Sequence, residues 1–306
     1  MKTSSNHFLW PKVSIKVSSF FGIRTKEELE NQLHKMFPSG FPVICSSGRV
    51  ALFIAISETS YDRTKKFRLF PFASHCVLST VGRLTNPYPY KTKSQTDVIY
   101  HQWGIPFNCN YTPLIEDSVD SLYERNTSLF KGGGKFEIWS LPKILGTSSG
   151  GILWCRKEKD AILIRSKINN KKGIFFSWIL RLLSHKLPFF YSLWEGTEKG
   201  YKGLSRLQIN EICNQIKLWD KLVKNRKKKL NLFKKYSILE DKNLSGRLPS
   251  CLPIKTNMSE QKLNKLGFST GIRHFLTDTT LEKVFPLPIH QDVSISSINN
   301  LFENEK

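Results

Sequence analysis

Short apolar runs alternate with helical patterns along the first half of the chain. Residues 42–46 form an apolar run that ends at Ser-Ser-Gly, and residues 50–56 continue as an apolar helix. Residues 67–72 and then 74–84 repeat this order of strand and helix. Strands that alternate with helices form parallel sheets with both faces covered. The pattern therefore predicts an α/β domain with a mainly parallel central sheet.

Further apolar segments extend this predicted sheet. Residues 97–101 and 113–116 are predicted strands, and so are residues 136–140 and 151–155, which bracket a polar loop. Beyond residue 160 the short apolar runs give way to longer helical patterns and basic stretches. We expect the large domain to end at this change.

The second half of the chain predicts a smaller domain of helices and strands. Residues 204–236 carry apolar positions at helical spacing and predict a long amphipathic helix. Apolar segments follow at residues 267–275 and 285–290. The expected divisions are an N-terminal arm (1–40), a large α/β domain (41–160), a helical connector (161–203) and a small α+β C-terminal domain (204–306).

The most apolar segment, residues 173–194, is too interrupted to span a membrane. A span needs about twenty consecutive apolar residues. This segment is interrupted by Arg181, His185, Lys186 and Pro188. A buried inter-domain helix is the simplest interpretation, and peripheral contact with an anionic membrane surface or with a partner subunit remains open.

The chain is strongly basic. Its 306 residues include 47 Lys and Arg against 25 Asp and Glu, a formal net charge of +22, which attracts polyanions to the surface. Part of the charge is concentrated in residues 224–229 and 234–235, which we interpret as the solvated face of a lysine-rich helix. The sequence contains no recognisable nucleic-acid module, so no nucleic-acid partner is expected.

Cysteine usage and the first residues indicate the compartment. The six cysteines lie far apart, at positions 45, 76, 109, 155, 213 and 251, without a CxxC pair. This pattern favours a reducing, cytoplasmic compartment. Residues 1–26 contain no acidic residue, but they also lack the apolar block of a secretory signal, so they are expected to form a mature N-terminal arm.

Some familiar motifs are present only in part. Residues 146–150 match the GxSxG pattern, but a predicted strand follows them where a hydrolase needs a helix, so Ser148 is not expected to be a nucleophile. Residues 131–135 are glycine-rich without the spacing of a phosphate-binding loop, and a connector is the better interpretation. No HExxH motif is present, and no metal is expected.

Polar groups follow several predicted strands at the point where each strand ends. They are Ser47 with Gly48 at a helix start, His75, Asp117, and the segment from Ser140 to Lys143. In an open parallel sheet, ligands bind outside the carboxyl ends of the strands. A helix start holds a phosphate, a carboxylate pairs with a pyridinium nitrogen, and a lysine forms a Schiff base, which together describe a pyridoxal phosphate (PLP) site.

Each of these residues has a structural alternative when it is taken alone. Lys143 is one lysine among many, Asp117 would serve equally well as a helix cap, and a lone histidine such as His75 is more often a satisfied core residue. Cys45 and Cys76 lie beside the predicted site and are expected to be packing residues. The order of the segments along the chain is what favours a common site.

That order resembles the DegT and StrS type of PLP-dependent nucleotide-sugar aminotransferases. The similarity spans residues 42–292, and the segments resemble the family's blocks in sequence order. They are Ser47–Leu52, Pro71–Cys76, Asp97–Gly104, Ile115–Asp117, Ile138–Lys143 followed by Gly150 and Gly151, and Phe285–His290.

The resemblance implies a fold type I transferase and assigns roles to the site residues. It implies that Lys143 holds PLP as an internal aldimine, that Asp117 pairs with the ring nitrogen and that His75 stacks on the ring. Ser47, Gly48 and Ser140 would anchor the phosphate. It also implies a nucleotide-linked keto sugar and an amino donor as substrates, and a homodimer with the active site at the subunit boundary.

The sequence departs from the family pattern at three positions. Asp120 stands where Gln, His or Glu is usual, Ser149 replaces an acidic residue, and Arg49 replaces a threonine. Arg49 would add a charge-assisted contact to the phosphate or lie at the surface as a cation at a helix start. Two alternative functions therefore stay open: a catalytically silent scaffold or regulator with the same fold, and a basic protein that binds polyanions or a membrane surface.

Overall fold

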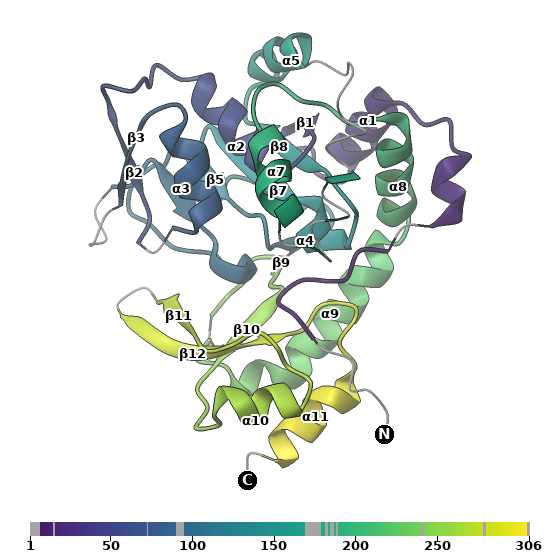
Figure 1. The fold of residues 1–306 in the computed structure, drawn as a ribbon, viewed down its shortest axis with the longest axis vertical. Coiled ribbons are helices and arrows are strands. Elements are labelled where there is room, and N and C mark those ends of the chain that lie inside the picture. The colour runs from purple at the N-terminus through teal and green to yellow at the C-terminus, as the bar shows by residue number, and fades with distance from the viewer. Residues whose placement is uncertain are drawn as a thin grey trace.

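The chain forms a larger part built on a central sheet and a smaller part below it (Figure 1). The structure is a computed structural model. It describes residues 7–14, 16–71, 73–89, 95–168, 179–180, 183, 187, 189–239, 242–277 and 280–304.

The central sheet has the strand order β1-β8-β7-β5-β4. Its strands are β1 (Phe41–Cys45), β8 (Gly151–Cys155), β7 (Phe136–Ser140), β5 (Ile115–Asp117) and β4 (Val98–Tyr100). β4, β5 and β7 are parallel, whereas β8 is antiparallel to both of its neighbours, so β1 runs in the same direction as β7. The prediction of a mainly parallel α/β sheet is confirmed, with β8 as the exception.

The reversal of β8 follows from the short connection that precedes it. A parallel partner needs a crossover of a dozen or more residues, and fewer separate the end of β7 from the start of β8. The predicted polar loop also begins with a short helix, α4 (Leu141–Leu145). The chain therefore turns back beside β7 and places α4 at the end of the sheet.

Helices cover both faces of the sheet, because side chains alternate between two hydrophobic cores along each strand. On β8, Leu153 and Cys155 pack into one core, and Ile152 and Trp154 pack into the other. The first core lies beneath α2 (Gly48–Ser57), α3 (His75–Gly82) and α5 (Glu158–Lys167), beside the parallel pair β2 (Lys66–Leu69) and β3 (Asn86–Pro89).

The second core extends from the sheet into the smaller part without interruption. It includes side chains from α1 (Lys26–Met36), whose Glu30 carboxylate accepts a hydrogen bond from the Ile44 amide at 2.9 Å. This contact holds α1 against β1. The end of the predicted N-terminal arm is therefore a helix of the larger part. The four predicted divisions of the chain stay predictions.

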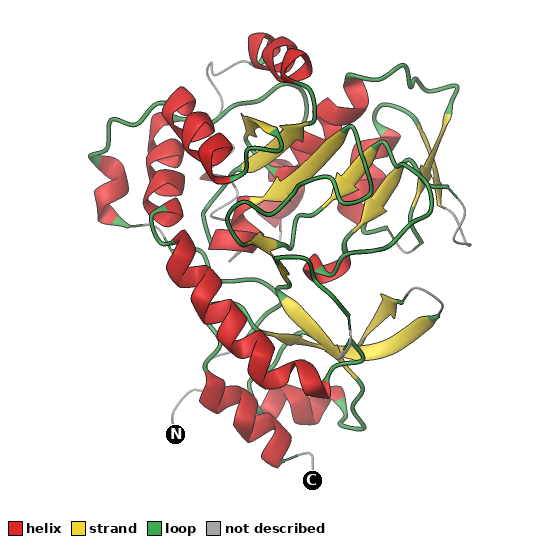
Figure 2. Cartoon of the chain, turned by 180° about the vertical axis from the view of Figure 1, so that it is seen from behind, coloured by secondary structure: helices red, strands yellow, loops and turns green. Residues whose placement is uncertain are grey.

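The long helix predicted over residues 204–236 is broken, and this prediction is wrong in that respect. The segment forms α8 (Arg206–Ile216), α9 (Trp219–Phe233) and a short 3₁₀ turn, η3 (Lys234–Tyr236). The chain leaves the helical path at Leu218, whose ψ is 2°. Figure 2 shows α9 running from the larger part down to the smaller one, so the break lets α8 and α9 pack against different parts.

The smaller part is an antiparallel sheet backed by helices. β12 (Leu281–Pro288) lies between β10 (Cys251–Ile254) and β11 (Arg273–Leu276). A strand pair formed by β6 (Leu122–Tyr123) and β9 (Arg247–Leu248) links this part to the larger one. The remaining elements are α10 (Glu260–Lys265), α11 (Ile295–Glu303), η1 (Val17–Phe20) and η2 (Gln102–Gly104).

Part of the apolar segment 173–194 lies outside the described residues, and this part includes Arg181, His185, Lys186 and Pro188. Its described end belongs to α7 (Phe189–Thr197). Trp194 is buried on this helix, but Phe189 is 71% exposed, so a fully buried inter-domain helix does not describe α7. Within the described residues, no helix is long and apolar enough to cross a membrane.

The basic run on α9 is not simply a solvated face, which corrects that prediction. Arg226 and Lys229 are 1% and 2% exposed. Lys229 donates to the His290 carbonyl at 2.6 Å, and Arg226 donates to the carbonyl of Ile144 at 3.3 Å. α9 lies between the two parts of the chain, so its inward cations reach backbone carbonyls. Burial lowers the pKa of Arg226 to about 10.

Replacing Lys229 by Met should change the pH dependence of stability. Burial, and then the charge of Arg226, lowers the pKa of Lys229 from 10.5 to about 8, so between these values the unfolded chain holds a proton that the folded chain releases. As the pH rises from about 8 to 10.5, the free energy of unfolding of the wild type should therefore increase relative to that of Lys229→Met, by up to about 1.4 kcal/mol per pH unit. Urea unfolding across this interval measures the difference.

The matched control is Lys228→Met, which changes the exposed lysine next to it. This variant should keep the pH dependence of the wild type. Equal slopes for the wild type and Lys229→Met would contradict a buried amine that deprotonates easily.

Candidate active site

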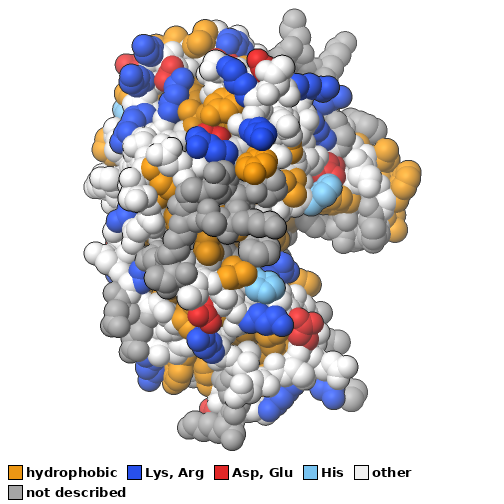
Figure 3. Space-filling view, turned by 90° about the vertical axis from the view of Figure 1, so that its left-hand side faces the viewer, with side chains coloured by type: hydrophobic (Ala, Val, Ile, Leu, Met, Phe, Trp, Pro, Cys, Tyr) orange, Lys and Arg blue, Asp and Glu red, His pale blue; other side chains and the backbone are white. Residues whose placement is uncertain are grey.

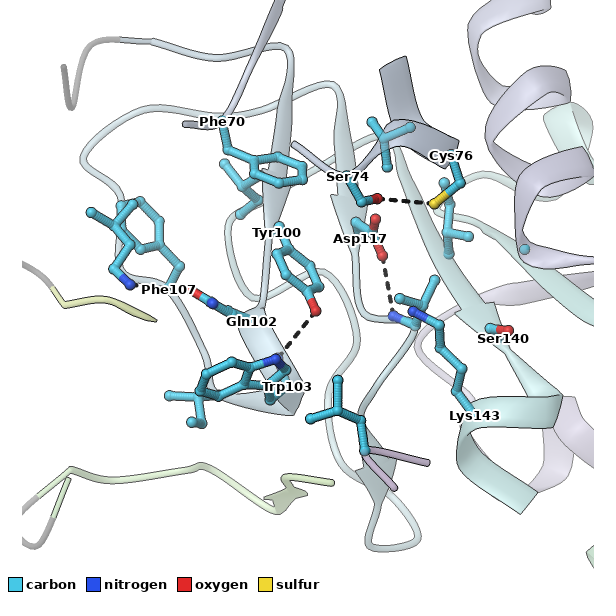
Figure 4. Close-up of a pocket in the computed structure, with 18 of the residues that line it drawn as sticks. Phe70, Ser74, Cys76, Tyr100, Gln102, Trp103, Phe107, Asp117, Ser140 and Lys143 are labelled. Atoms are coloured by element: carbon cyan, nitrogen blue, oxygen red, sulfur yellow. Dashed lines mark hydrogen bonds between the residues drawn. The ribbon is translucent and has the colours of Figure 1, made fainter. Parts of the chain in front are cut away.

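A cavity of about 1160 Å³ lies at the carboxyl ends of β4, β5 and β7. Its lining comes from the larger part, from β11 of the smaller part and from the N-terminal segment around Trp10. The molecule is hollowed between the two parts (Figure 3), and side chains from several elements point into the cavity (Figure 4). This is the edge of the sheet at which the sequence predicts a site.

Lys143 points into the cavity from α4 (Figure 4). The helix starts directly after Ser140 at the end of β7, and Pro142 stands in its first turn, where proline fits without loss of a hydrogen bond. The side chain is 29% exposed, and its Nζ lies 3.4 Å from Asp120 Oδ1. Burial alone would lower the pKa of Lys143, but the negative charges of Asp120 and Asp117 outweigh it and raise the pKa.

Asp117 is the last residue of β5 and lines the cavity opposite Lys143. It is 6% exposed, and its Oδ1 accepts a hydrogen bond from the Val119 amide at 3.2 Å. Burial raises the pKa of Asp117 to about 6, with Asp120 adding to the rise and Lys143 opposing it. A cationic partner in the cavity would stabilise the carboxylate and lower this pKa again.

A cradle of small residues forms where α2 starts beside β7. Ser47 caps α2 by accepting a hydrogen bond from the Val50 amide at 3.2 Å. A Cβ on Gly48 would lie 3.3 Å from the Cβ of Ser140, so the two residues are nearly in contact. Ser47, Gly48 and Ser140 all line the cavity. Amide groups at a helix start bind anions, and this cradle suits a phosphate.

Gly151 makes this approach possible. A Cβ at this position would overlap the Ser47 carbonyl carbon and lie 2.6 Å from the Gly48 nitrogen. Only glycine therefore lets the start of β8 touch the start of α2. Gly151, the second of the paired glycines noted in the sequence, therefore has a steric role that brings the lysine-bearing segment to the helix start.

Arg49 lines the same end of the cavity, but α7 already engages it. Its Nη1 lies 3.2 Å from Glu195 Oε1, and its guanidinium donates to the Tyr191 hydroxyl. The guanidinium carbon lies 4.8 Å from the centre of the Trp194 ring. The side chain is only 15% exposed, which excludes the surface-cation interpretation.

The structure does not bring His75 to the place expected for it. Its side chain is 80% exposed, and its Nδ1 lies 3.7 Å from Glu195 Oε1. His75 is the first residue of α3, and its neighbours Ser74 and Cys76 face the cavity, so the residue between them points away. Among the aromatic residues of the cavity wall, Tyr100 lies beside Asp117 instead (Figure 4).

Sequence reasoning missed Trp10 and Tyr100, which meet at Asp120. Trp10 Nε1 donates to Asp120 Oδ1 at 2.6 Å, and the Tyr100 hydroxyl donates to Oδ2. Trp10 lies outside any helix or strand, so no periodic pattern marks it. Tyr100 ends β4 and lies within the predicted strand 97–101, but the strand pattern does not mark its side chain as part of a site.

Ser148 is a structural residue. It is fully buried, and its amide donates to Glu211 Oε1 at 2.6 Å. Its hydroxyl donates to the other carboxylate oxygen of the same residue. The hydroxyl is therefore turned into the protein, which agrees with the expectation that the GxSxG match carries no nucleophile.

The residues that line the cavity fit PLP. Lys143 offers an amine to an aldehyde, and Asp117 is a buried carboxyl group suited to a pyridine nitrogen. The cradle of Ser47, Gly48 and Ser140 suits the phosphate. The cavity is also larger than a typical ligand pocket, so a substrate has room beside the cofactor.

Comparison with known proteins supports this assignment. A family model described as "Putative PLP-dependent aminotransferase" matches residues 29–305. No protein with a curated description matches the sequence.

Solved aminotransferases share the fold at low sequence identity. The PMP-form of "Putative sugar aminotransferase Spr1654" from Streptococcus pneumoniae is 12% identical, with a TM-score of 0.65 and coverage of 97% of this chain and 98% of that chain. A DegT DnrJ EryC1 StrS aminotransferase from Brucella abortus is 13% identical, with a TM-score of 0.62 and coverage of 94% and 91%. AtS13 from Actinomadura melliaura is 11% identical, with a TM-score of 0.67 and coverage of 99% of both chains.

These similarities confirm the fold type I architecture expected from the sequence. The family match covers far more than half of the chain, and the cavity supplies the groups that the cofactor needs. The chain therefore belongs to the family of PLP-dependent aminotransferases, and PLP is its cofactor.

Proposed function

We propose that the protein transfers an amino group from an amino donor to a keto sugar carried by a nucleotide, with Lys143 as the residue that bonds to the cofactor. The observation that carries the proposal is the convergence of Lys143, Asp117 and the cradle at Ser47 and Ser140 in one cavity. Lys143 and Ser140 follow the end of β7, Asp117 ends β5, and Ser47 follows β1, so three strand ends supply an amine, a carboxylate and an anion cradle to one cavity.

Each residue would have a defined task in this reaction. Bound PLP supplies an aldehyde for the amino group and a protonated ring that accepts electrons. Asp117 would keep the ring nitrogen protonated, because a buried carboxylate favours a cation beside it. Lys143, once it leaves the cofactor, would move the proton as general base and acid. Ser47, Gly48 and Ser140 would hold the phosphate in the cradle.

Other residues in the cavity wall support a large anionic substrate. Arg273 and His274 of β11, Lys242 and Phe107 also line the cavity. Cationic side chains bind phosphate oxygens, and aromatic faces stack on nucleobases. The net charge of +22 would attract a diphosphate group towards the molecule. The similarity in fold to solved proteins named sugar aminotransferases agrees with this substrate class.

A homodimer in the cytoplasm is part of the same proposal. Large apolar side chains are exposed on α7 and beside η1, with Phe189 at 71% and Phe21 at 80%, as expected for surfaces covered in an assembly. The cysteines of the described residues are free, which suits a reducing compartment.

The covalent role of Lys143 can be tested in the purified protein. The wild type incubated with PLP and reduced with borohydride should carry a cofactor adduct on the peptide that contains Lys143, as located by mass spectrometry. Lys143→Ala should lack the adduct and lose transamination by more than about 100-fold, since it removes the proton-transferring group.

Lys131→Ala, at an exposed lysine outside the cavity, is the control and should keep both the adduct and the activity. An adduct on another lysine of the wild type would overturn the assignment. Bound cofactor with no spectral response to any amino donor would favour a silent scaffold.

Asp117→Asn should weaken cofactor binding in a pH-dependent way. Burial raises the pKa of Asp117 to about 6, so its carboxylate is present above this pH and lost below it. The ratio of wild-type to variant affinity for PLP should therefore increase as the pH rises through about 6, by up to about tenfold per pH unit. Titrations followed by absorbance measure this ratio.

The exposed Asp62→Asn is the matched control and should follow the wild type at every pH. A ratio that does not change with pH would show that Asp117 does not pair with the cofactor.

A further inference from the structure

We propose that Trp10 and Asp120 form a resting place for the ammonium group of Lys143, so that the N-terminal segment acts as a positioning element of the active site. The proposal rests on the proposed function of Lys143. It assigns a role to two residues that touch the lysine from outside the cofactor cradle.

Asp120 is shaped to receive a cation. It is fully buried, and both of its carboxylate oxygens are engaged. Oδ1 accepts from Trp10 Nε1 at 2.6 Å and lies 3.4 Å from Lys143 Nζ, while Oδ2 accepts from the Tyr100 hydroxyl. The two neutral donors hold the carboxylate in place, and the lysine supplies an opposite charge beside it.

Trp10 contributes its ring as well as its N–H group. Lys143 Nζ lies 4.4 Å from the centre of the Trp10 ring. A cation over the face of a tryptophan ring is attracted by the ring's electrons. The ammonium group is therefore held between an aromatic face and a carboxylate, and a single side chain orients both contacts.

The backbone around Trp10 is anchored to both parts of the molecule. The His7 amide donates to the Gly267 carbonyl of the smaller part at 2.7 Å. The Lys12 amide donates to Asp292 Oδ2 at 2.6 Å, and the Ser14 amide donates to the Gly146 carbonyl, just after α4, at 3.0 Å. Trp10 thus has a fixed position relative to the helix that carries Lys143.

The charges around the amine favour its protonated form. Asp120 faces it from the turn after β5, Asp117 from β5 itself and Cys76 from α3, and these groups raise the pKa of Lys143 against the effect of burial. The cation of Arg226 on α9 also interacts with Asp120. A lysine in this state is stored as an ammonium ion and must lose a proton before its nitrogen can bond to an aldehyde.

Lys143 has to leave the cofactor when an amino group is transferred, and a released ammonium ion needs a partner within reach. Asp120 and Trp10 provide that partner without occupying Asp117, which stays available for the cofactor ring. They are positioning residues, since they act through Lys143.

Acylation of the cofactor-free, full-length protein tests the proposal. Acetic anhydride reacts only with unprotonated amines, so the pH dependence of labelling at Lys143, followed by mass spectrometry, gives the midpoint of its titration. Asp120→Asn should lower this midpoint by about 1 to 3 pH units, the effect expected from losing an adjacent opposite charge. Trp10→Ala should lower it by less, and Trp10→Phe, which keeps an aromatic face, should restore part of the loss.

Phe8→Ala is the matched control, because Phe8 is an aromatic residue of the same segment that is 47% exposed and does not line the cavity. It should leave the midpoint unchanged. Unchanged midpoints in both Asp120→Asn and Trp10→Ala would overturn the proposal, as would an equal shift in Phe8→Ala. Labelling needs no cofactor, so failure of the adduct experiment on the wild type would count against the proposed function and leave this measurement independent.

Discussion

The active site depends on one close approach between backbones. The start of β8 lies against the start of α2, and a side chain at Gly151 would overlap the Ser47 carbonyl carbon. Because β8 is the next element after α4, this approach brings Lys143 and the helix start to the same end of the sheet. The lack of a Cβ at Gly151 thus allows the cradle of small residues and the Lys143 amine to line the same cavity. The reversal of β8 within a mainly parallel sheet is part of the same arrangement.

Local pattern was sufficient to predict the framework of this site. The bounds of β7 and β8 agree with the apolar runs, and Asp117 and Ser140 stand at strand ends as expected. Alternation along a strand and the carboxyl-end rule depend on neighbours in sequence, so they can be recognised without the fold. The role of Gly151, by contrast, depends on a contact across more than a hundred residues, and the sequence only marked it as one of a glycine pair.

The predictions that failed depend on small rotations or on distant packing. His75 misses the cavity because adjacent residues at a helix start point in different directions, and its neighbours take the inward positions. Arg226 and Lys229 were predicted to be solvated because a charge run usually is. In the structure, they donate to the backbone carbonyls of Ile144 and His290, which come from the two parts of the chain that pack on α9. Trp10 belongs to a stretch with no periodicity, so its meeting with Asp120 follows only from the fold.

Two carboxylates lie beside one lysine, and the repulsion between them would be costly if both depended on that lysine as their partner. Like charges in a buried site raise each other's pKa, and the raised pKa of Asp117 reflects this in part. The structure limits the conflict by giving the carboxylates different partners. Asp120 accepts hydrogen bonds from two neutral donors and pairs with the Lys143 amine, whereas Asp117 accepts a hydrogen bond from one amide and lines the cavity. A cation that enters beside Asp117 therefore meets a carboxylate that faces the cavity, while Lys143 keeps Asp120 as its partner. In the proposed reaction, the separation of the two acids would let one site hold a pyridinium ring and an ammonium group together.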